Sequence, residues 1–176
     1  KDMGLLDLES TIEKEKDMHL FPFTSEAHEF SYIIQRIKHS DLPREEIFIL
    51  ARTNRQLSEL SKKLKQKGIS HVVKSDEINR GVIAKEGEIT LATIHAIKGL
   101  EAEMVFVMGC TSLNFPCRGS EHPVIDMIKV DEYDKEEEER RLFYVAVSRA
   151  RNKLILSYSG KKHSYFINNE MRSMFD

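Results

Sequence analysis

The chain has 176 residues and a formal net charge of −2, with 32% charged and 40% hydrophobic residues. This composition excludes a disordered chain, and the length fits one domain with an ordinary core. The near-neutral charge excludes a protein that holds nucleic acid by bulk charge alone, but it leaves room for a local basic groove. The longest apolar runs are too short to span a bilayer, and two cysteines cannot form a disulfide framework, so we expect a cytoplasmic protein without a membrane partner.

The sequence predicts one folded domain behind a polar lead-in. Residues 1–18 are mainly polar and charged, and we expect them to be flexible, with the domain over residues 19–176. We see no internal repeat or low-complexity tract that divides the chain further. Because the first residue is Lys1 rather than methionine, we expect the chain to be a piece of a longer protein.

The first part of the domain predicts a strand, a helix and a second strand. His19–Phe23 has the composition of a strand, and Ser25 is a typical N-cap for a helix that reaches His39. After Pro43, the continuous apolar run Ile47–Ala51 has the length of a buried strand. The apolar positions of the helix have helical spacing and are Phe30, Ile33, Ile34 and Ile37.

A second helix and a third strand follow in the same alternation. Asn54 is the expected N-cap of this helix, and Gly68 is the expected stop. Ile69–Val73 then predicts a strand. The helix face toward the core is expected to comprise Leu57, Leu60 and Leu64.

The second half of the domain predicts further strands around one long helix. Strands are expected at Ile89–Ile94, Met104–Met108 and Leu154–Tyr158, and a helix from Asp134 to Ala150. Near-continuous apolar strands that alternate with helices predict a mostly parallel sheet covered on both faces, which is a three-layer α/β/α domain. In such folds ligands bind outside the carboxyl ends of the strands, where we therefore expect functional side chains.

Arg52 directly follows the predicted strand Ile47–Ala51 and lies beside the expected N-cap Asn54. A guanidinium group and helix amide groups that converge at a strand end are well placed to bind an anion. The alternative is a surface arginine beside an ordinary Asn cap.

A second polar cluster connects two predicted strands and has the sequence TIHAIKGLE. Thr93, His95 and Lys98 can each donate a hydrogen bond to phosphate, and Gly99 allows a close approach of the backbone to a ligand. Glu101 adds a carboxylate at the end. Taken singly, His95 is also explained as a structural histidine and Lys98 as a solvated charge. Their concentration in one short connection favours a functional loop.

The third cluster is a helix whose sequence is EEEERRLFYVAVSRAR. Its acidic start and basic end complement the helix dipole, so the glutamates indicate a helix start rather than a catalytic pair. By its spacing Arg149 shares a helix face with apolar residues, where a charge without an anionic partner is costly. The alternatives are a pair with Glu138 or a neighbour, or a side chain that reaches past the helix edge to solvent. Arg140 and Arg151 are expected on the solvated side. The apolar residues of the shared face are Leu142, Val145 and Ala146.

No metal site is expected from this sequence. Cys110, Cys117 and His122 are the residues that suggest one, but the spacing of the two thiols fits no common zinc motif. The sequence also shows no Ser-His-Asp arrangement that would favour nucleophilic catalysis.

Three of these stretches together resemble motifs of the UvrD/Rep-type superfamily 1 DNA helicases. ILARTN looks like the fourth motif of that family, TIHAIKGLE like the fifth and EEERRLFYVAVSRA like the sixth, in the same order and after predicted strands. The long fifth and sixth motifs are specific, whereas the fourth is short. The resemblance covers about Ile47 to Tyr158, and Ser164–Phe166 is similar to the tail that follows the last strand of the family.

The resemblance implies the C-terminal, second RecA-like motor domain of such a helicase, with a P-loop NTPase-like sheet. In the family, ATP binds between two such domains and its hydrolysis drives steps along single-stranded DNA, so ATP and Mg²⁺ are the cofactors implied for the full-length protein. By motif match, Arg149 is implied as the arginine finger on the γ-phosphate and Arg52 as a second contact to it. Gly99 and Glu101 are implied to face the nucleotide, with Glu101 near the ribose. The implied DNA contacts are Thr93, His95 and Lys98.

The resemblance also implies single-stranded DNA and an N-terminal RecA-like domain of the same polypeptide as partners of a monomeric chain. The sequence contains no G-x-x-x-x-G-K-[ST] motif, so the phosphate cradle and its Mg²⁺-binding hydroxyl are absent from this chain. With the Walker A and B motifs missing, we expect the chain alone to be inactive as an ATPase. The alternative hypotheses are a non-catalytic RecA-like module that binds DNA or a protein, and a degenerate structural domain.

Three features depart from the pattern of the family. Ala51 stands where an aromatic residue that stacks on adenine is often found, just before the fourth-motif arginine. Only residues 55–92 separate the fourth and fifth motifs, where long members carry a large additional subdomain. Ser148 stands where threonine is common and keeps the hydroxyl group.

Overall fold

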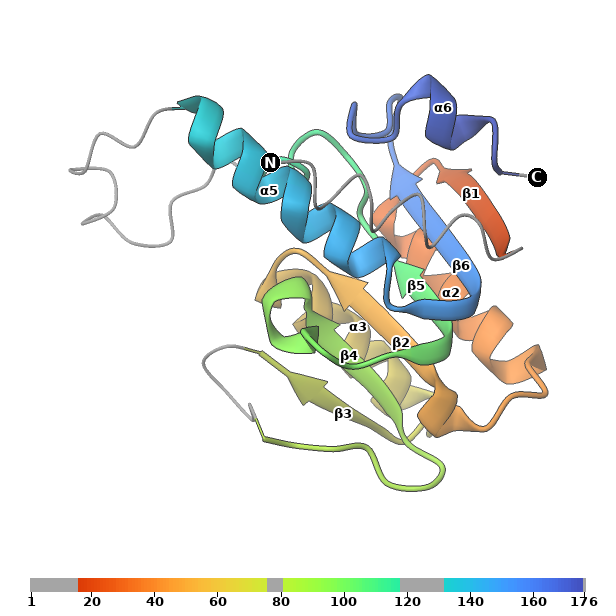
Figure 1. Ribbon diagram of the computed structural model, residues 1–176. Helices are drawn as coiled ribbons and strands as arrows, with labels where there is room; N and C mark the ends of the chain where they lie inside the picture. Colours follow the sequence, from red (N-terminus) through yellow and green to blue (C-terminus); the bar gives the residue numbers. More distant parts are fainter. Residues whose placement is uncertain (1–15, 76–80, 118–131, 176) are drawn as a thin grey trace.

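The computed structural model describes residues 16–75, 81–117 and 132–175, and within them six strands form a single sheet (Figure 1). All neighbouring strands are parallel, in the order β1-β6-β5-β2-β4-β3. The strands are β1 (Asp17–Phe23), β2 (Ile47–Ala51), β3 (His71–Lys74), β4 (Ile89–Thr93), β5 (Ala102–Val107) and β6 (Ala150–Ser159). The helices are α2 (Glu26–His39), α3 (Asn54–Gln66), α5 (Glu132–Val147) and α6 (Asn169–Arg172), with the short 3-10 helices η1 (Arg44–Glu46) and η2 (Ile94–Ile97).

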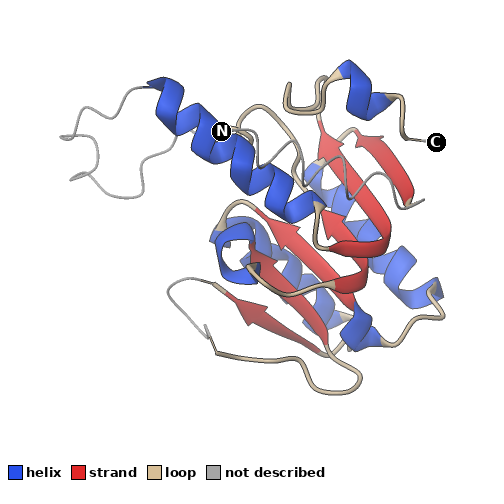
Figure 2. Cartoon of the chain, viewed as in Figure 1, coloured by secondary structure: helices blue, strands red, loops and turns tan. Residues whose placement is uncertain are grey.

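Helices cover both faces of the sheet and give the domain three layers (Figure 2). The apolar side chains of α2 and α3 pack on one face, and those of α5, η2 and the C-terminal tail pack on the other. Alternate residues of β2 enter the two cores, with Ile49 toward α2 and α3 and with Phe48 and Leu50 toward α5. The predicted three-layer α/β/α fold with a parallel sheet is therefore confirmed.

Helix α2 has the predicted N-cap, Ser25, whereas the N-cap of α3 lies one residue before the predicted one. The hydroxyl of Ser25 accepts a hydrogen bond from the backbone N–H of His28 at 3.2 Å. The N-cap of α3 is Thr53, and Asn54 is the first helical residue. The side-chain oxygen of Gln56 accepts hydrogen bonds from the N–H of Thr53 at 3.3 Å and from its hydroxyl at 2.9 Å. A capping box needs Glu or Gln three residues after the cap, which Thr53 has and Asn54 lacks.

The largest difference from the sequence-based expectation lies between α5 and β6. The helix predicted to reach Ala150 ends at Val147, and Ser148 and Arg149 form a turn. Ala150 instead begins β6, where it pairs with Ala102 of β5. This pairing joins residues far apart in the sequence, and such tertiary contacts override local helix propensity.

The remaining strands begin and end within two residues of their predicted bounds. β1 begins at Asp17, inside the predicted lead-in of residues 1–18, and residues 1–15 of that lead-in lie outside the described part of the chain. Gly68 ends α3 with a φ of +70°, a left-handed conformation that favours glycine. None of the helices in the described ranges is long and apolar enough to cross a membrane.

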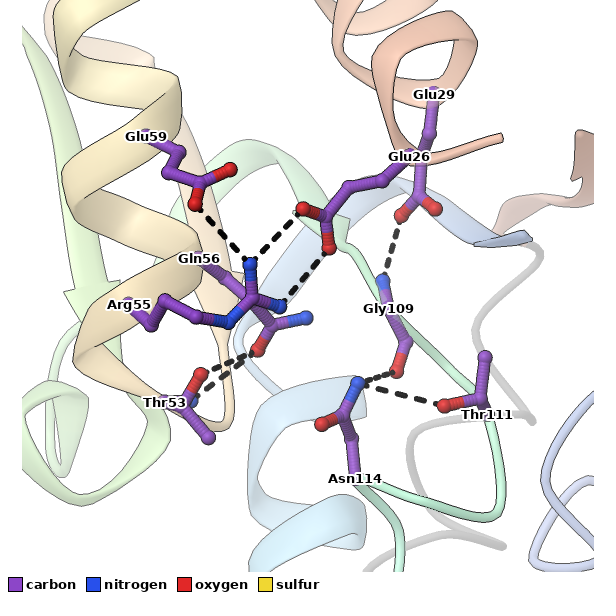
Figure 3. A network of polar contacts seen from close by, with 9 residues as sticks. All are labelled: Glu26, Glu29, Thr53, Arg55, Gln56, Glu59, Gly109, Thr111 and Asn114. Atoms are coloured by element: carbon purple, nitrogen blue, oxygen red, sulfur yellow. Dashed lines mark hydrogen bonds and ion pairs between the residues drawn. The ribbon is translucent and has the colours of Figure 1, made fainter.

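A buried carboxylate ties α2 to the carboxyl ends of β5 and β6. Glu29 is 1% exposed, and its Oε1 accepts hydrogen bonds from the N–H of Gly109 at 2.6 Å, shown in Figure 3, and from the hydroxyl of Ser157 at 3.0 Å. Its Oε2 is buried without a hydrogen-bond partner in the described ranges. Burial raises the pKa of Glu29 above its ordinary value, against the two hydrogen bonds, which favour the ionised form.

We predict that Glu29→Gln stabilises the domain near neutral pH. Because the folded-state pKa is raised, the stability that belongs to protonated Glu29 is complete below its unfolded pKa of 4.5 and is lost as the pH rises through the folded value. Glutamine keeps the neutral shape and the acceptor at every pH. The gain should be about 1.4 kcal/mol for each unit by which the pKa is raised.

Urea unfolding of both proteins near pH 7 and near pH 4.5 checks this expectation. The variant should have the higher free energy of unfolding at neutral pH, and the difference should shrink in acid. A variant that is less stable than the parent at neutral pH would contradict the assignment.

Candidate functional site

Arg52 is held by a carboxylate of α5 instead of lying on the surface. It follows β2 on the side of the sheet that α5 covers, and its Nε and Nη2 donate hydrogen bonds to the two carboxylate oxygens of Glu139 at 2.9 and 2.6 Å. The side chain of Arg52 is only 15% exposed and that of Glu139 only 11%. The backbone N–H of Cys117 also donates to Glu139, at 3.0 Å. The alternative of a surface arginine is therefore wrong, and the neighbouring cap is Thr53 rather than Asn54.

Glu139 is the partner that the sequence-based argument missed. We interpreted the four consecutive glutamates as the acidic start of a helix, but Glu139 lies in the interior of α5 and is 8% exposed. Its spacing from Leu142, Phe143 and Ala146, which are all buried, places it on the helix face toward the core. That spacing is the signal that could have distinguished it from its neighbours.

The fifth-motif segment starts at the carboxyl end of β4 and crosses the sheet beneath α5. Thr93 ends β4, and Ile94 and Ile97 of η2 are fully buried in the core that α5 shares. The hydroxyl oxygen of Thr93 is buried without a hydrogen-bond partner in the described ranges. His95 is partly buried and Lys98 is exposed. The two buried isoleucines thus fix the position of the polar residues on either side of them.

The exposed end of this segment turns at Gly99 before β5 begins. Gly99 has a φ of +81°, and a Cβ atom built there would meet no atom within 4 Å. Its positive φ alone favours glycine here, and the close approach of a ligand to Gly99 stays a prediction. Leu100 is 38% exposed, and Glu101 is also exposed.

Arg149 lies in the turn after α5, beside that exposed end. Its Nε donates to the carbonyl of Val145 at 3.2 Å and its Nη2 to the hydroxyl of Ser148 at 3.0 Å. Its Nη1 lies 3.5 Å from the carbonyl oxygen of Leu100. No carboxylate in the described ranges pairs with it, and Glu138, the partner considered from the sequence, lies 3.8 Å from Arg141 instead. The guanidinium is thus positioned by neutral acceptors and remains partly exposed.

The structure brings some of the predicted site residues together and separates others. Arg149 adjoins the Gly99–Glu101 segment, because its carbonyl accepts a hydrogen bond from Ala102 at 3.0 Å. This group lies at the amino ends of β5 and β6, not at the carboxyl ends where we expected chemistry. Arg52 lies at the carboxyl end of β2 and contacts Glu139 of α5. Glu139 lies about two turns before the end of α5, which is roughly 12 Å along the helix axis.

The two other arginines considered from the sequence, Arg140 and Arg151, differ in their exposure to solvent. Arg140 was expected in solvent, but its side chain is 29% exposed and its guanidinium lies 4.7 Å from the centre of the Phe166 ring. Arg151 is more exposed, as predicted, and pairs with Glu46 and Glu103.

Cys110 lies apart from this site, whereas Cys117 contributes its backbone N–H to Glu139. Cys110 is buried and donates through its sulfur to the carbonyl of Val107 at 3.2 Å, and burial raises the pKa of this thiol well above its ordinary value. His122 lies outside the described residues. Within the described ranges, no group of three or more His, Cys, Asp or Glu side chains could hold a metal ion.

Comparison with known proteins decides the family. A model described as UvrD-like helicase C-terminal domain matches residues 74–161, half of the chain. The chain belongs to this family. The match includes the segment from Thr93 to Glu101, the whole of α5 and the turn with Arg149. It does not include Arg52.

Relatives of this UvrD-like domain carry helicase names. It is 36% identical over 85 residues to a probable DNA helicase II homolog of Mycoplasma capricolum, covering 48% of this chain and 10% of that protein. It is 40% identical over 77 residues to DNA helicase II of Escherichia coli, covering 44% and 9%. It is 32% identical over 98 residues to ATP-dependent DNA helicase Rep of Buchnera aphidicola, covering 55% and 13%. The chain therefore spans about a tenth of the length of these relatives.

A solved structure supports the fold over the whole UvrD-like domain. The C-terminal domain of a possible DNA helicase from Lactobacillus plantarum WCFS1 superposes with a TM-score of 0.64 and 18% sequence identity. The match covers 98% of this chain and 94% of that one. The α/β architecture therefore extends beyond the residues that the family model matches.

We predict that Gly109→Ala destabilises the domain more than Gly99→Ala does. Both glycines have positive φ, so alanine costs about 1–2 kcal/mol at either position. At Gly109 a Cβ atom would also lie 2.1 Å from Nε2 of Gln56, whose side chain is buried and caps α3 through Thr53. Urea unfolding of the two variants should show a clearly larger loss for Gly109→Ala. Equal losses would mean that Gln56 moves aside at no cost.

Proposed function

We propose that this domain is the second RecA-like motor domain of an ATP-dependent DNA helicase or translocase. The observation that carries the proposal is the environment of Arg149. Its guanidinium is held by neutral oxygen atoms, no carboxylate in the described ranges pairs with it, and it adjoins the exposed Gly99–Glu101 segment. An arginine that is oriented but not neutralised suits an anionic ligand that arrives from outside the domain.

ATP would bind between this domain and an N-terminal RecA-like domain of the same polypeptide, which would also hold Mg²⁺. Arg149 would act as the arginine finger on the γ-phosphate, and Arg52 as a second contact to that phosphate. Both arginines contact or adjoin α5, at points roughly 12 Å apart along its axis, so joint contact with one phosphate requires them to move toward each other when ATP binds. Glu101, whose side chain is exposed, would accept a hydrogen bond from the ribose, with Gly99 beside it. An arginine finger is typically worth about 10³–10⁵ in turnover.

Single-stranded DNA would contact the same segment. Thr93, His95 and Lys98 are proposed to contact the DNA backbone, which is where a protein binds without reading sequence. The exposed side chain of Lys98 supports a ligand contact there, whereas the hydroxyl of Thr93 is buried and would be reached only after a movement of the segment. Because one short segment would touch DNA through Thr93, His95 and Lys98 and nucleotide through Gly99 and Glu101, a shift caused by one ligand would be transmitted to the contacts of the other.

We predict that Arg149→Ala in the full-length protein abolishes most of the DNA-stimulated ATPase activity. Turnover should fall by about 10³-fold or more, because transition-state charge on the phosphoryl oxygens is no longer neutralised. Nucleotide binding, measured by titration with a fluorescent ATP analogue, should change far less. Arg151→Ala is the matched control, since Arg151 lies two residues away and pairs with Glu46 and Glu103. Unchanged turnover in Arg149→Ala would refute the arginine-finger role.

We also predict that the 176-residue chain alone hydrolyses ATP at no more than the uncatalysed rate. The reason is chemical, because the sequence contains no G-x-x-x-x-G-K-[ST] loop to cradle the phosphates. A phosphate-release assay with and without oligothymidine measures this. Robust hydrolysis by the purified chain would show that a different phosphate site exists in it.

A further inference from the structure

The ion pair between Arg52 and Glu139 links two segments that the proposed function requires to act together. We propose that Glu139 is a positioning residue, which fixes the guanidinium of Arg52 for the γ-phosphate and couples it to α5. This inference rests on the proposed function, because it takes Arg52 as a phosphate contact.

The geometry specifies the orientation of the guanidinium group. Both Nε and Nη2 of Arg52 donate to Glu139, so the plane of the guanidinium and the direction of its remaining edge are fixed. A third donor, the N–H of Cys117, holds Oε2 of the same carboxylate at 3.0 Å. The carboxylate is thus itself held in place by a backbone group, and it cannot follow Arg52 freely. Such a fixed carboxylate is suited to hold an arginine in one direction.

The pair also differs from the other ion pairs of the same helix. Glu136 lies 3.2 Å from Arg140, and Glu138 lies 3.8 Å from Arg141, so these pairs join residues within α5. Glu139 is directed across the helix face to the segment after β2. It is therefore the carboxylate of this acidic run that, among the described residues, links α5 to Arg52.

A purely stabilising role explains the pair poorly. A buried ion pair gains little over an apolar pair of similar volume, because desolvation of both charges offsets their attraction. The position of the pair offers a better reason. The helix that carries Glu139 ends at Val147, two residues before Arg149, so a movement of α5 displaces both arginines that are proposed to contact the phosphate. Because Glu139 holds Arg52, a displacement of α5 moves Arg52 together with Arg149.

A double-mutant cycle in the full-length protein tests this role. The variants are Arg52→Gln, Glu139→Gln and the two combined, with Glu138→Gln as the matched control on the exposed side of α5. We expect Glu139→Gln to lower kcat about tenfold with little change in the KM for ATP, since orientation is lost and the binding pocket is kept. Glu138→Gln should leave kcat unchanged. In the Arg52→Gln background, Glu139→Gln should have no further effect on kcat.

The outcomes separate this inference from the proposed function. If Arg52→Gln leaves kcat unchanged, the proposed phosphate contact of Arg52 fails, and with it this inference. If Arg52→Gln lowers kcat but Glu139→Gln does not, or if the two losses multiply, the positioning role is wrong and the proposed function stands.

A charge swap distinguishes positioning from folding. Arg52→Glu combined with Glu139→Arg restores an ion pair, so we expect its melting temperature to exceed that of either single substitution while kcat stays low. Glu139→Asp keeps the charge on a shorter side chain and should retain more kcat than Glu139→Gln. Recovery of kcat by the swapped pair would show that the pair serves the fold alone and would overturn the proposal.

Discussion

Both faces of the parallel sheet are buried, and this constraint determines where polar side chains can lie. Within the described residues, the strand interiors are almost entirely apolar, so charged groups gather at strand ends or reach a partner on a covering helix. Glu29 reaches the carboxyl ends of β5 and β6 from α2, and Glu139 reaches Arg52 from α5. Both carboxylates therefore join layers of the domain, and one of them does so at a residue proposed to contact phosphate.

The same constraint explains the course of the segment from Thr93 to Glu101. β4 and β5 are parallel, so a connection that leaves the carboxyl end of one must cross the sheet to reach the amino end of the next. Ile94 and Ile97 bury the middle of this connection beneath α5. The start of the connection thus lies at the carboxyl ends of the strands and its finish at their amino ends. A buried, packed centre joins the two. That packed centre gives a physical route by which the proposed DNA contacts of the segment would influence its proposed nucleotide contacts.

The sequence alone predicted those features that depend on local pattern. The strand Ile47–Ala51 and the buried face of α2 were predicted correctly, because apolar periodicity reports burial directly. The end of α5 was not, because the pairing of Ala150 with Ala102 is non-local. Glu139 was hidden in a run of glutamates that also complements a helix dipole. Its spacing from buried apolar residues of α5 distinguishes it from the other glutamates, but the position of Arg52 in space is needed to identify its partner.

We propose that Arg149 and Arg52 contact one phosphate group when this domain closes on a nucleotide. The most direct test is a crystal structure of the full-length protein with a non-hydrolysable ATP analogue and single-stranded DNA. The account predicts both guanidinium groups within about 2.7–2.9 Å of γ-phosphate oxygens, with Glu139 still bound to Arg52. A structure in which the analogue is bound but Arg149 keeps its contacts to Val145 and Leu100, away from the phosphate, would contradict it.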